Sequence, residues 1–242
     1  MTHPENETLK ATPLTPWHRE AEARMVPYAG FEMPVQYRGV LAEHAVVREK
    51  VGLFDITHMG EILVKGTDAD AWLSGLTTNR VTGLAVGAVV YTAMCRADGG
   101  VLDDMLVYRL GDEEWMVVCN AANHAKIAAW LTAAVEGADV QLDDVSDATA
   151  MIAVQGPEAP VLMERLAILA GLLDDLRGLD FYSAFTCDGP AGRWIVSPTG
   201  YTGERGYELY IPNPDAADLW VELMKAGEDL RVQPIGLPAR AT

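Results

Sequence analysis

The segment Gly99–Tyr108 constrains the fold of this chain more than any other. Its Gly99-Gly100 pair is typical of a turn, and the next eight residues, rich in Val, Leu and Tyr, predict a β-strand. Glu114–Cys119 has the pattern of its hairpin partner, with Leu110–Glu113 as the connecting turn. The chain is therefore expected to build at least part of its core from antiparallel strands.

Two adjacent carboxylates, Asp103 and Asp104, interrupt this otherwise apolar strand. Charges in a poorly solvated place need partners or shifted pKa values. Period-2 alternation predicts one face with Val101, Asp103, Met105 and Val107 and the other with Leu102, Asp104, Leu106 and Tyr108. Asp104 thus shares a face with a tyrosine. The strand alone leaves two interpretations open: a functional carboxylate, or a turn cap at a solvated strand end.

Hydrophobic periodicity predicts a mixture of helices and strands without a regular βαβ repeat. The predicted helices are 19–25, 40–50, 69–76, 123–134, 158–169 and 214–226. The predicted strands are 61–65, 88–94, 101–108, 114–119, 150–155, 192–197 and 207–211, and 143–149 is a polar connection. Residues 25–37 look too irregular for a regular element and fit a pocket wall or a packed loop. The fold class expected is α+β.

The charge balance narrows the function classes. Lys and Arg number 18 against 35 Asp and Glu, a net charge of −17, which argues against a general nucleic-acid binder or adhesion to an anionic membrane. The chain has no apolar run of membrane-spanning length, and its first residues lack a signal-peptide pattern. We expect a soluble, cytoplasmic monomer. The five histidines show no metal-ligand spacing, so no metal site is predicted.

The segment Thr199–Glu208 carries three glycines and two tyrosines. Glycines at this density allow sharp turns and a close backbone approach to a flat ligand. Beyond Gly206, alternation predicts Glu208 on one face, where it could accept two N–H donors from a heterocycle. A hairpin loop with solvated acids explains the spacing equally well.

Taken together, these segments resemble the aminomethyltransferase (T-protein) family of the glycine cleavage system. The motifs that carry the resemblance are Arg24–Pro34, Glu43-His44 with Arg48, Gly52–Gly60, Thr78-Asn79, Gly99–Asp104, Asn120–Asn123, Gln155–Pro157, Thr199–Glu208 and Gly236–Arg240. The resemblance implies a folate-binding fold of two interlocked subdomains, each a mainly antiparallel sheet with helices. The first would comprise residues 1–50 and 145–242, and the second residues 51–144. Relatives continue into a C-terminal β-barrel domain, which we expect to be absent here.

The resemblance also implies a reaction: the aminomethyl group on the lipoyl arm of H-protein passes to tetrahydrofolate. The products are 5,10-methylenetetrahydrofolate, ammonia and the reduced lipoyl carrier. The essential acid falls on Asp104, which would hold and polarise the folate nitrogens. The implied folate-binding residues are Tyr91, Tyr108, Asn120, Tyr201, Glu208 and Arg240. Glu208 would accept from the pterin amino edge, with Arg240 as a fixed cation nearby.

Three alternatives remain open at this point. One is a folate-dependent demethylase acting on dimethylsulfoniopropionate or N-methylated glycines. Another is a folate-binding relative without transfer activity, and the last is an inactive fragment of the transferase. The motifs define the superfamily more sharply than the second substrate.

Overall fold

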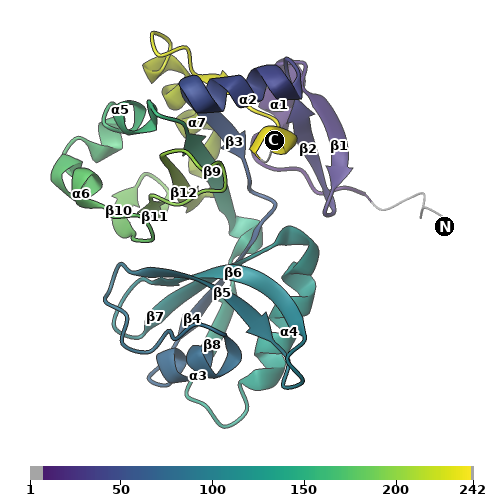
Figure 1. The fold of residues 1–242 in the computed structure, drawn as a ribbon, viewed down its shortest axis with the longest axis vertical. Helices are drawn as coiled ribbons and strands as arrows, with labels where there is room; N and C mark the ends of the chain where they lie inside the picture. Colours follow the sequence, from purple (N-terminus) through teal and green to yellow (C-terminus); the bar gives the residue numbers. More distant parts are fainter. Residues whose placement is uncertain (1–7, 241–242) are drawn as a thin grey trace.

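The computed structural model describes residues 8–240 and shows two lobes, each built on one sheet (Figure 1). Almost all neighbouring strands are antiparallel, and helices pack on both sheets. The predicted α+β class is confirmed.

The upper lobe in Figure 1 contains a six-stranded sheet of order β10-β11-β12-β9-β3-β13. Its strands are β10 (Phe185–Gly189), β11 (Gly192–Ser197), β12 (Gly206–Pro212), β9 (Thr149–Gln155), β3 (Gly52–Asp55) and β13 (Gln233–Pro234). Its helices are α1 (Thr15–Glu20), α2 (Val40–Glu49), α5 (Ala159–Met163), α6 (Leu173–Gly178) and α7 (Ala216–Ala226), with 3-10 turns η3 (Ala167–Leu169), η4 (Asn213–Asp215) and η5 (Leu237–Arg240). The amphipathic α7 buries Leu219, Trp220 and Leu223 in the core of this lobe.

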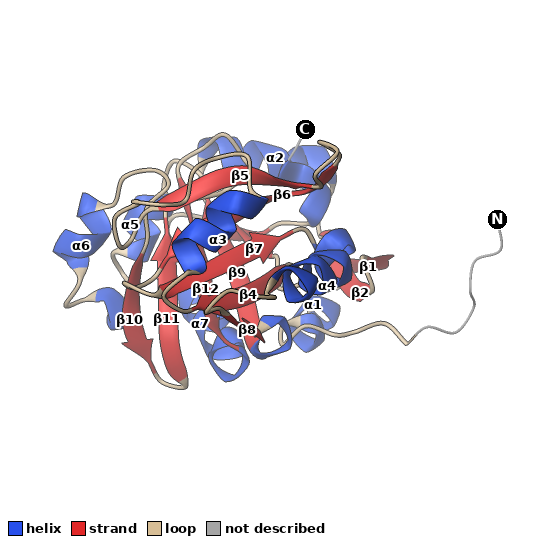
Figure 2. Cartoon of the chain, turned by 90° about the horizontal axis from the view of Figure 1, so that it is seen from below, coloured by secondary structure: helices blue, strands red, loops and turns tan. Residues whose placement is uncertain are grey.

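The lower lobe contains a five-stranded sheet of order β5-β6-β7-β4-β8. Its elements are β4 (Gly60–Lys65), α3 (Ala69–Leu76), β5 (Val89–Cys95), β6 (Val101–Arg109), β7 (Glu114–Cys119), η1 (Ala121–Asn123), α4 (His124–Ala134), β8 (Gln141–Asp144) and η2 (Ser146–Ala148). Helices α3 and α4 cover one face of the sheet (Figure 2), where Leu73 and Leu131 pack with Val107 and Val117. The predicted hairpin is confirmed as β6 paired with β7.

The other face of the five-stranded sheet packs toward the upper lobe. Leu106 and Val118 of the lower sheet share a buried cluster with Phe54, Met151 and Tyr210 of the upper sheet. The two sheets are therefore joined by a common apolar core, and side chains from β6 and β12 can reach the same space.

A buried polar cluster of Thr12, His18 and Asp55, joined by the half-buried Tyr37, fixes the N-terminal segment to β3. The Asp55 carboxylate accepts from Thr12 Oγ1 at 2.6 Å and contacts His18 Nε2 at 2.9 Å, and the Tyr37 hydroxyl lies 2.8 Å from His18 Nδ1. Burial, then Asp55 and Glu43, raise the pKa of Tyr37, so the phenol keeps its proton. The two ring nitrogens of His18 thus link the Tyr37 hydroxyl to the Asp55 carboxylate.

The segment 25–37 is more regular than the sequence suggested. Strands β1 (Arg24–Tyr28) and β2 (Phe31–Gln36) pair antiparallel around Ala29-Gly30, both of which have positive φ. The prolines are tolerated because this ribbon has only two strands, so N–H groups missing from an outer edge break no ladder. The helix predicted over 19–25 is wrong beyond Glu20, since β1 begins at Arg24.

Three further expectations need correction. The helix predicted over 158–169 is divided into α5 and η3, which bury Leu162 and Leu169 in one core by two separate turns. The connection predicted over 143–149 includes the end of β8, because edge strand β8 pairs with β4. Helix α6 and strand β10 carry weak periodic signals and were not predicted.

Sheet membership bears on how the lobes are divided along the chain. Strand β3 falls inside the range 51–144 predicted for the second subdomain, yet it pairs with β9 in the six-stranded sheet. Strand β8 ends at Asp144, and β9 then returns to the upper lobe. The division into 1–50 with 145–242 and 51–144 stays a prediction.

Candidate functional site

An inner cavity of about 60 Å³ lies in the core between the lobes. Its lining residues are Ile56, Met59, Asp104, Met105, Leu106, Val118, Asn120, Met151, Tyr201 and Glu208. An adjoining space of about 20 Å³ shares Ile56, Tyr201 and Glu208 with it. The walls are mostly apolar, and the polar groups come from both sheets and from the loops beside them. This composition is typical of a small-molecule site.

Asp104 presents its carboxylate to the inner cavity from β6. Oδ2 accepts from the Tyr91 hydroxyl at 2.8 Å, and Oδ1 accepts from Asn120 Nδ2 at 3.2 Å. The hydrogen bond to Asp104 is the main reason why the pKa of Tyr91 is raised, so Tyr91 keeps its proton and donates. Three of the predicted site residues are therefore in direct contact.

Asp103 is in a different environment from its neighbour. It is only 3% exposed and accepts from the Asn120 backbone N–H at 2.9 Å, from Asn120 Nδ2 at 3.0 Å and from Asn123 Nδ2 at 2.5 Å. These donors compensate the buried carboxylate and hold Asn120 in place beside Asp104. Its contacts identify Asp103 as a structural residue.

The predicted alternation holds from Asp103 to Tyr108 and is wrong before it. The β5–β6 register shifts by one residue between Met94 and Cys95. As a result Val101 is 63% exposed, whereas Leu102 packs in the same cluster as Met105 and Val107. The irregularity could not be read from the residue pattern because it depends on strand pairing.

Glu208 enters the inner cavity from β12, on the opposite sheet. The residue is 3% exposed, and its Oε2 accepts from Thr199 Oγ1 and, at 3.5 Å, from the Tyr210 hydroxyl. Loop 199–206 is held beside it by Gln155, which donates to the Thr199 carbonyl and accepts from Thr202 Oγ1. A carboxylate oriented this way can accept N–H donors from a ligand in the cavity.

Tyr108 lies behind the wall of the inner cavity. Its side chain is fully buried, with the hydroxyl 2.8 Å from the Tyr210 hydroxyl and 3.3 Å from Thr199 Oγ1. Burial and the charge of Glu208 raise its pKa. The predicted face is confirmed, but the contact of Tyr108 with Glu208 runs through Thr199 and Tyr210.

Exposed aromatic side chains surround Asp104. Tyr91 is 40% exposed and Tyr201 52%, and burial followed by Asp104, Tyr91, Glu208 and Tyr182 raises the pKa of Tyr201. Tyr182 was not predicted; it has φ of +62° and its carbonyl accepts from the Val89 N–H at 2.9 Å. The adjacent Phe181 could have indicated Tyr182 as a site residue, because the two form an exposed aromatic pair.

Arg240 belongs to η5, but its side chain lies outside the described part of the chain. The backbone before it is held by His44 Nδ1 near the Ala239 carbonyl at 3.2 Å and by the Gly236 N–H, which donates to Glu43 at 2.7 Å.

Within residues 8–240 no three His, Cys, Asp or Glu side chains are grouped to hold a metal ion. None of the helices described there is long and apolar enough to cross a membrane.

The size of the inner cavity sets a condition on any ligand. Ligand pockets usually measure about 300–1,000 Å³, so a volume of about 60 Å³ is too small for a fused two-ring heterocycle without movement of the walls. Tyr201 and Met59 are the side chains best able to move, since one is half exposed and the other is flexible. The acceptor oxygens of this cavity fit a heterocycle with N–H groups, because Glu208, Asp104 and Asn120 line one space.

Comparison with known proteins shows the family to which the chain belongs. A family model described as the GCVT N-terminal domain matches residues 14–242. This chain belongs to that family. An aminomethyltransferase from Desulfitobacterium hafniense strain Y51 is 42% identical over 234 residues, and one from Geobacillus kaustophilus is 45% identical over 234 residues; each alignment covers 97% of this chain.

A solved structure extends the likeness to three dimensions. The glycine cleavage system aminomethyltransferase T from Bartonella henselae matches with a TM-score of 0.86 at 34% identity, covering 96% of this chain and 61% of the other. The present chain spans 63% of the length of the two curated relatives.

Proposed function

We propose that this chain is an aminomethyltransferase of the glycine cleavage system that uses tetrahydrofolate as co-substrate and lipoylated H-protein as partner. The observation that carries the proposal is the meeting of Asp104 and Glu208, from two different sheets, at one inner cavity. The relatives, which are named aminomethyltransferases, support the same reaction class. The methylene carbon would leave the lipoyl sulfur, ammonia would depart, and 5,10-methylenetetrahydrofolate would form.

When bound, tetrahydrofolate would supply the two nitrogens that accept the methylene carbon. Glu208 would orient the ring by accepting N–H donors, with Thr199 and Tyr210 fixing its carboxylate and Tyr108 supporting them. Tyr91 and Tyr201 would cover the ring at the exposed side, and Arg240 would add a positive charge. These roles are part of the proposal.

In this proposal Asp104 would act at the reacting nitrogen. Its carboxylate is held by Tyr91 and Asn120 and faces a mostly apolar cavity, where a negative charge stabilises developing positive charge more than it would in water. It can also accept a proton. The hydroxyl of Tyr91 and the amide of Asn120 keep the carboxylate aimed at the cavity.

The direct test is a single incubation with tetrahydrofolate and aminomethylated H-protein, followed by measurement of ammonia and methylenetetrahydrofolate. Formation of both products in equal amounts is expected. Folate binding without either product would defeat the transferase proposal and favour a non-catalytic folate-binding protein. Product formation from N-methylated glycine or dimethylsulfoniopropionate, with none from H-protein, would favour a demethylase.

A further inference from the structure

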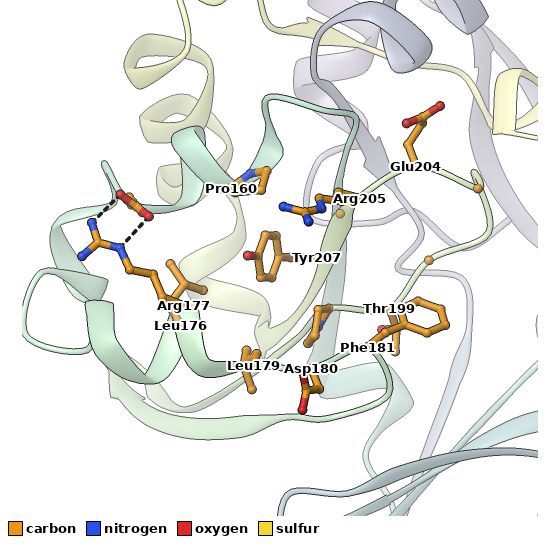
Figure 3. A pocket seen from close by; sticks show the side chains of 15 residues that line it. Pro160, Leu176, Arg177, Leu179, Asp180, Phe181, Thr199, Glu204, Arg205 and Tyr207 are labelled. Carbon is orange, nitrogen blue, oxygen red and sulfur yellow. Dashed lines mark hydrogen bonds and ion pairs between the residues drawn. The ribbon is translucent and has the colours of Figure 1, made fainter.

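A second and larger hollow, the outer groove, measures about 700 Å³ and lies beside α5 and α6 (Figure 3). It lies across the upper sheet from the inner cavity, because Tyr207 lines the groove, Glu208 lines the cavity, and consecutive strand residues point to opposite faces. Gly200 lines both the groove and the space adjoining the cavity. Loop 199–206 is therefore a wall shared by the two hollows.

Tyr207 forms the floor of the outer groove. Its side chain is only 9% exposed and packs in the core of the upper lobe, but within the described residues its hydroxyl has no hydrogen-bond partner. Figure 3 shows the ring projecting toward the space between β12 and α6. The hydroxyl is not enclosed by protein atoms, so this donor is available to a ligand in the groove.

Arg205 lies above Tyr207 and extends to the same side of the strand (Figure 3). Its guanidinium forms no ion pair or hydrogen bond with any residue of the described chain, although acidic residues outnumber basic ones about two to one. Burial raises the pKa of the Tyr207 hydroxyl, and the charge of Arg205 partly opposes this rise. The guanidinium and the hydroxyl are therefore close enough to interact.

A second arginine that lines the groove, Arg177, already forms an ion pair. Arg177 donates from Nε and one terminal nitrogen to both oxygens of Glu164, at 2.8 and 2.7 Å. The backbone of Arg205 is fixed, since its carbonyl accepts from the Gly156 N–H at 2.8 Å and the neighbouring Glu204 pairs with Arg48 at 2.8 Å. Arg205 is thus an exposed cation on a fixed backbone, and its guanidinium has no partner among the described residues.

The rest of the groove is suited to an apolar body. Leu176, Leu179, Phe181 and Pro160 line it around Tyr207, and its volume falls in the usual range for organic ligands. Asp180, the remaining acid on this wall, points away from Arg205 in Figure 3. An anion at Arg205 therefore meets a guanidinium and a hydroxyl donor beside an apolar surface.

We propose that the outer groove binds the carboxylate of an organic acid with an apolar body, through Arg205 and the Tyr207 hydroxyl. Guanidinium and carboxylate pair well in geometry and charge, and a phenol adds a second donor. The acid has two possible sources: the glutamyl tail of a folate held in the inner cavity, reaching around the shared loop, or a separate small molecule. The first source rests on the proposed function, and the second does not.

Two sets of titrations with the full chain separate these sources. The first compares tetrahydrofolate bearing one glutamate with the form bearing three. The second compares N-acetylphenylalanine with its neutral amide, followed by chemical-shift changes. Both are repeated with Arg205→Gln and Tyr207→Phe, and with Arg24→Gln as the control. Arg24 is an exposed arginine of β1 that forms no ion pair among the described residues.

We expect an approximately tenfold loss of carboxylate-dependent affinity in Arg205→Gln, as for one charged hydrogen bond, and a smaller loss in Tyr207→Phe. An advantage of the three-glutamate form that disappears in Arg205→Gln identifies the folate tail. If the wild type prefers N-acetylphenylalanine to its amide and Arg205→Gln does not, the ligand is a separate small molecule. The proposal is overturned if the acid and the amide bind equally and the added glutamates also have no effect. It is overturned as well if a preference for the carboxylate persists in both Arg205→Gln and Tyr207→Phe. Binding of the one-glutamate form reports on the inner cavity, so failure of the proposed function is seen separately.

Discussion

The buried polar cluster and the inner cavity each contain an aspartate, but the two carboxylates are satisfied to different degrees. Asp55 is 1% exposed and receives hydrogen bonds from Thr12, His18 and the Thr57 N–H. Asp104 is only partly buried and receives two, from Tyr91 and Asn120, while it faces a cavity. A carboxylate enclosed by protein donors therefore stabilises the fold. A carboxylate that lines a cavity and can accept further hydrogen bonds can act on a ligand.

The largest effect should come from Asp104→Asn. Loss of the negative charge should reduce folate-dependent ammonia release about a thousandfold, because an electrostatic stabiliser and proton acceptor is removed at once. The thermal midpoint should change little. Asp143→Asn, an exposed change on the same sheet, is the control. A variant with wild-type turnover would remove Asp104 from the mechanism.

Asp55→Asn should show the opposite profile, with a loss in the free energy of unfolding of about 3 kcal/mol, measured by urea denaturation. Burial raises the pKa of Asp55, but the hydrogen bonds from His18 and Thr12 outweigh it and the net pKa is lowered. The stabilisation is therefore present above the unfolded pKa near 4 and is lost as the pH falls through the folded value. The gap between wild type and variant should narrow below about pH 4; a constant gap would contradict this assignment.

Glu61 tests whether burial alone makes a carboxylate stabilising. It is fully buried, and among the described residues both carboxyl oxygens lack a hydrogen-bond partner. Burial, then the charge of Asp144, raise its pKa well above the usual range. Its contribution is present below about pH 4.5 and is lost as the pH rises. Glu61→Gln should therefore stabilise the protein at pH 8, where the wild-type carboxyl has lost this contribution. The difference should vanish near pH 4, and its absence at both pH values would show that Glu61 finds a partner.

The smallest effect is expected from Tyr108→Phe. This change removes one buried hydroxyl that contacts Tyr210 and Thr199, which should cost about 1 kcal/mol of stability. Because Tyr108 lies behind the cavity wall, folate affinity measured by calorimetry should change no more than about threefold. Tyr201→Ala, which removes a wall of the inner cavity, is the informative comparison. A larger loss in Tyr108→Phe would place its hydroxyl in contact with the ligand.

Much of the lower lobe could be predicted from local patterns. The β6–β7 hairpin and helix α3 follow from strand alternation and helical periodicity. Both patterns are set by residues close together in sequence. Two segments of the upper lobe could not be predicted in this way. The β1–β2 ribbon contains prolines, which are tolerated because its outer edges are open. The segment 158–169 forms two separate turns because both pack into one core.

The sequence by itself determined the family motifs, the acidic character and the face that Asp104 shares with Tyr108. Only the tertiary structure decided that Asp104 and Glu208, 104 residues apart in sequence, line one cavity, and that Asp103 is enclosed by Asn120 and Asn123. It also decided that Arg205, at the outer groove, has no partner in the part of the chain that the structure describes. The physical reason is that alternation assigns a side chain to a face of its own strand. The groups across that face are set by how the two sheets pack together.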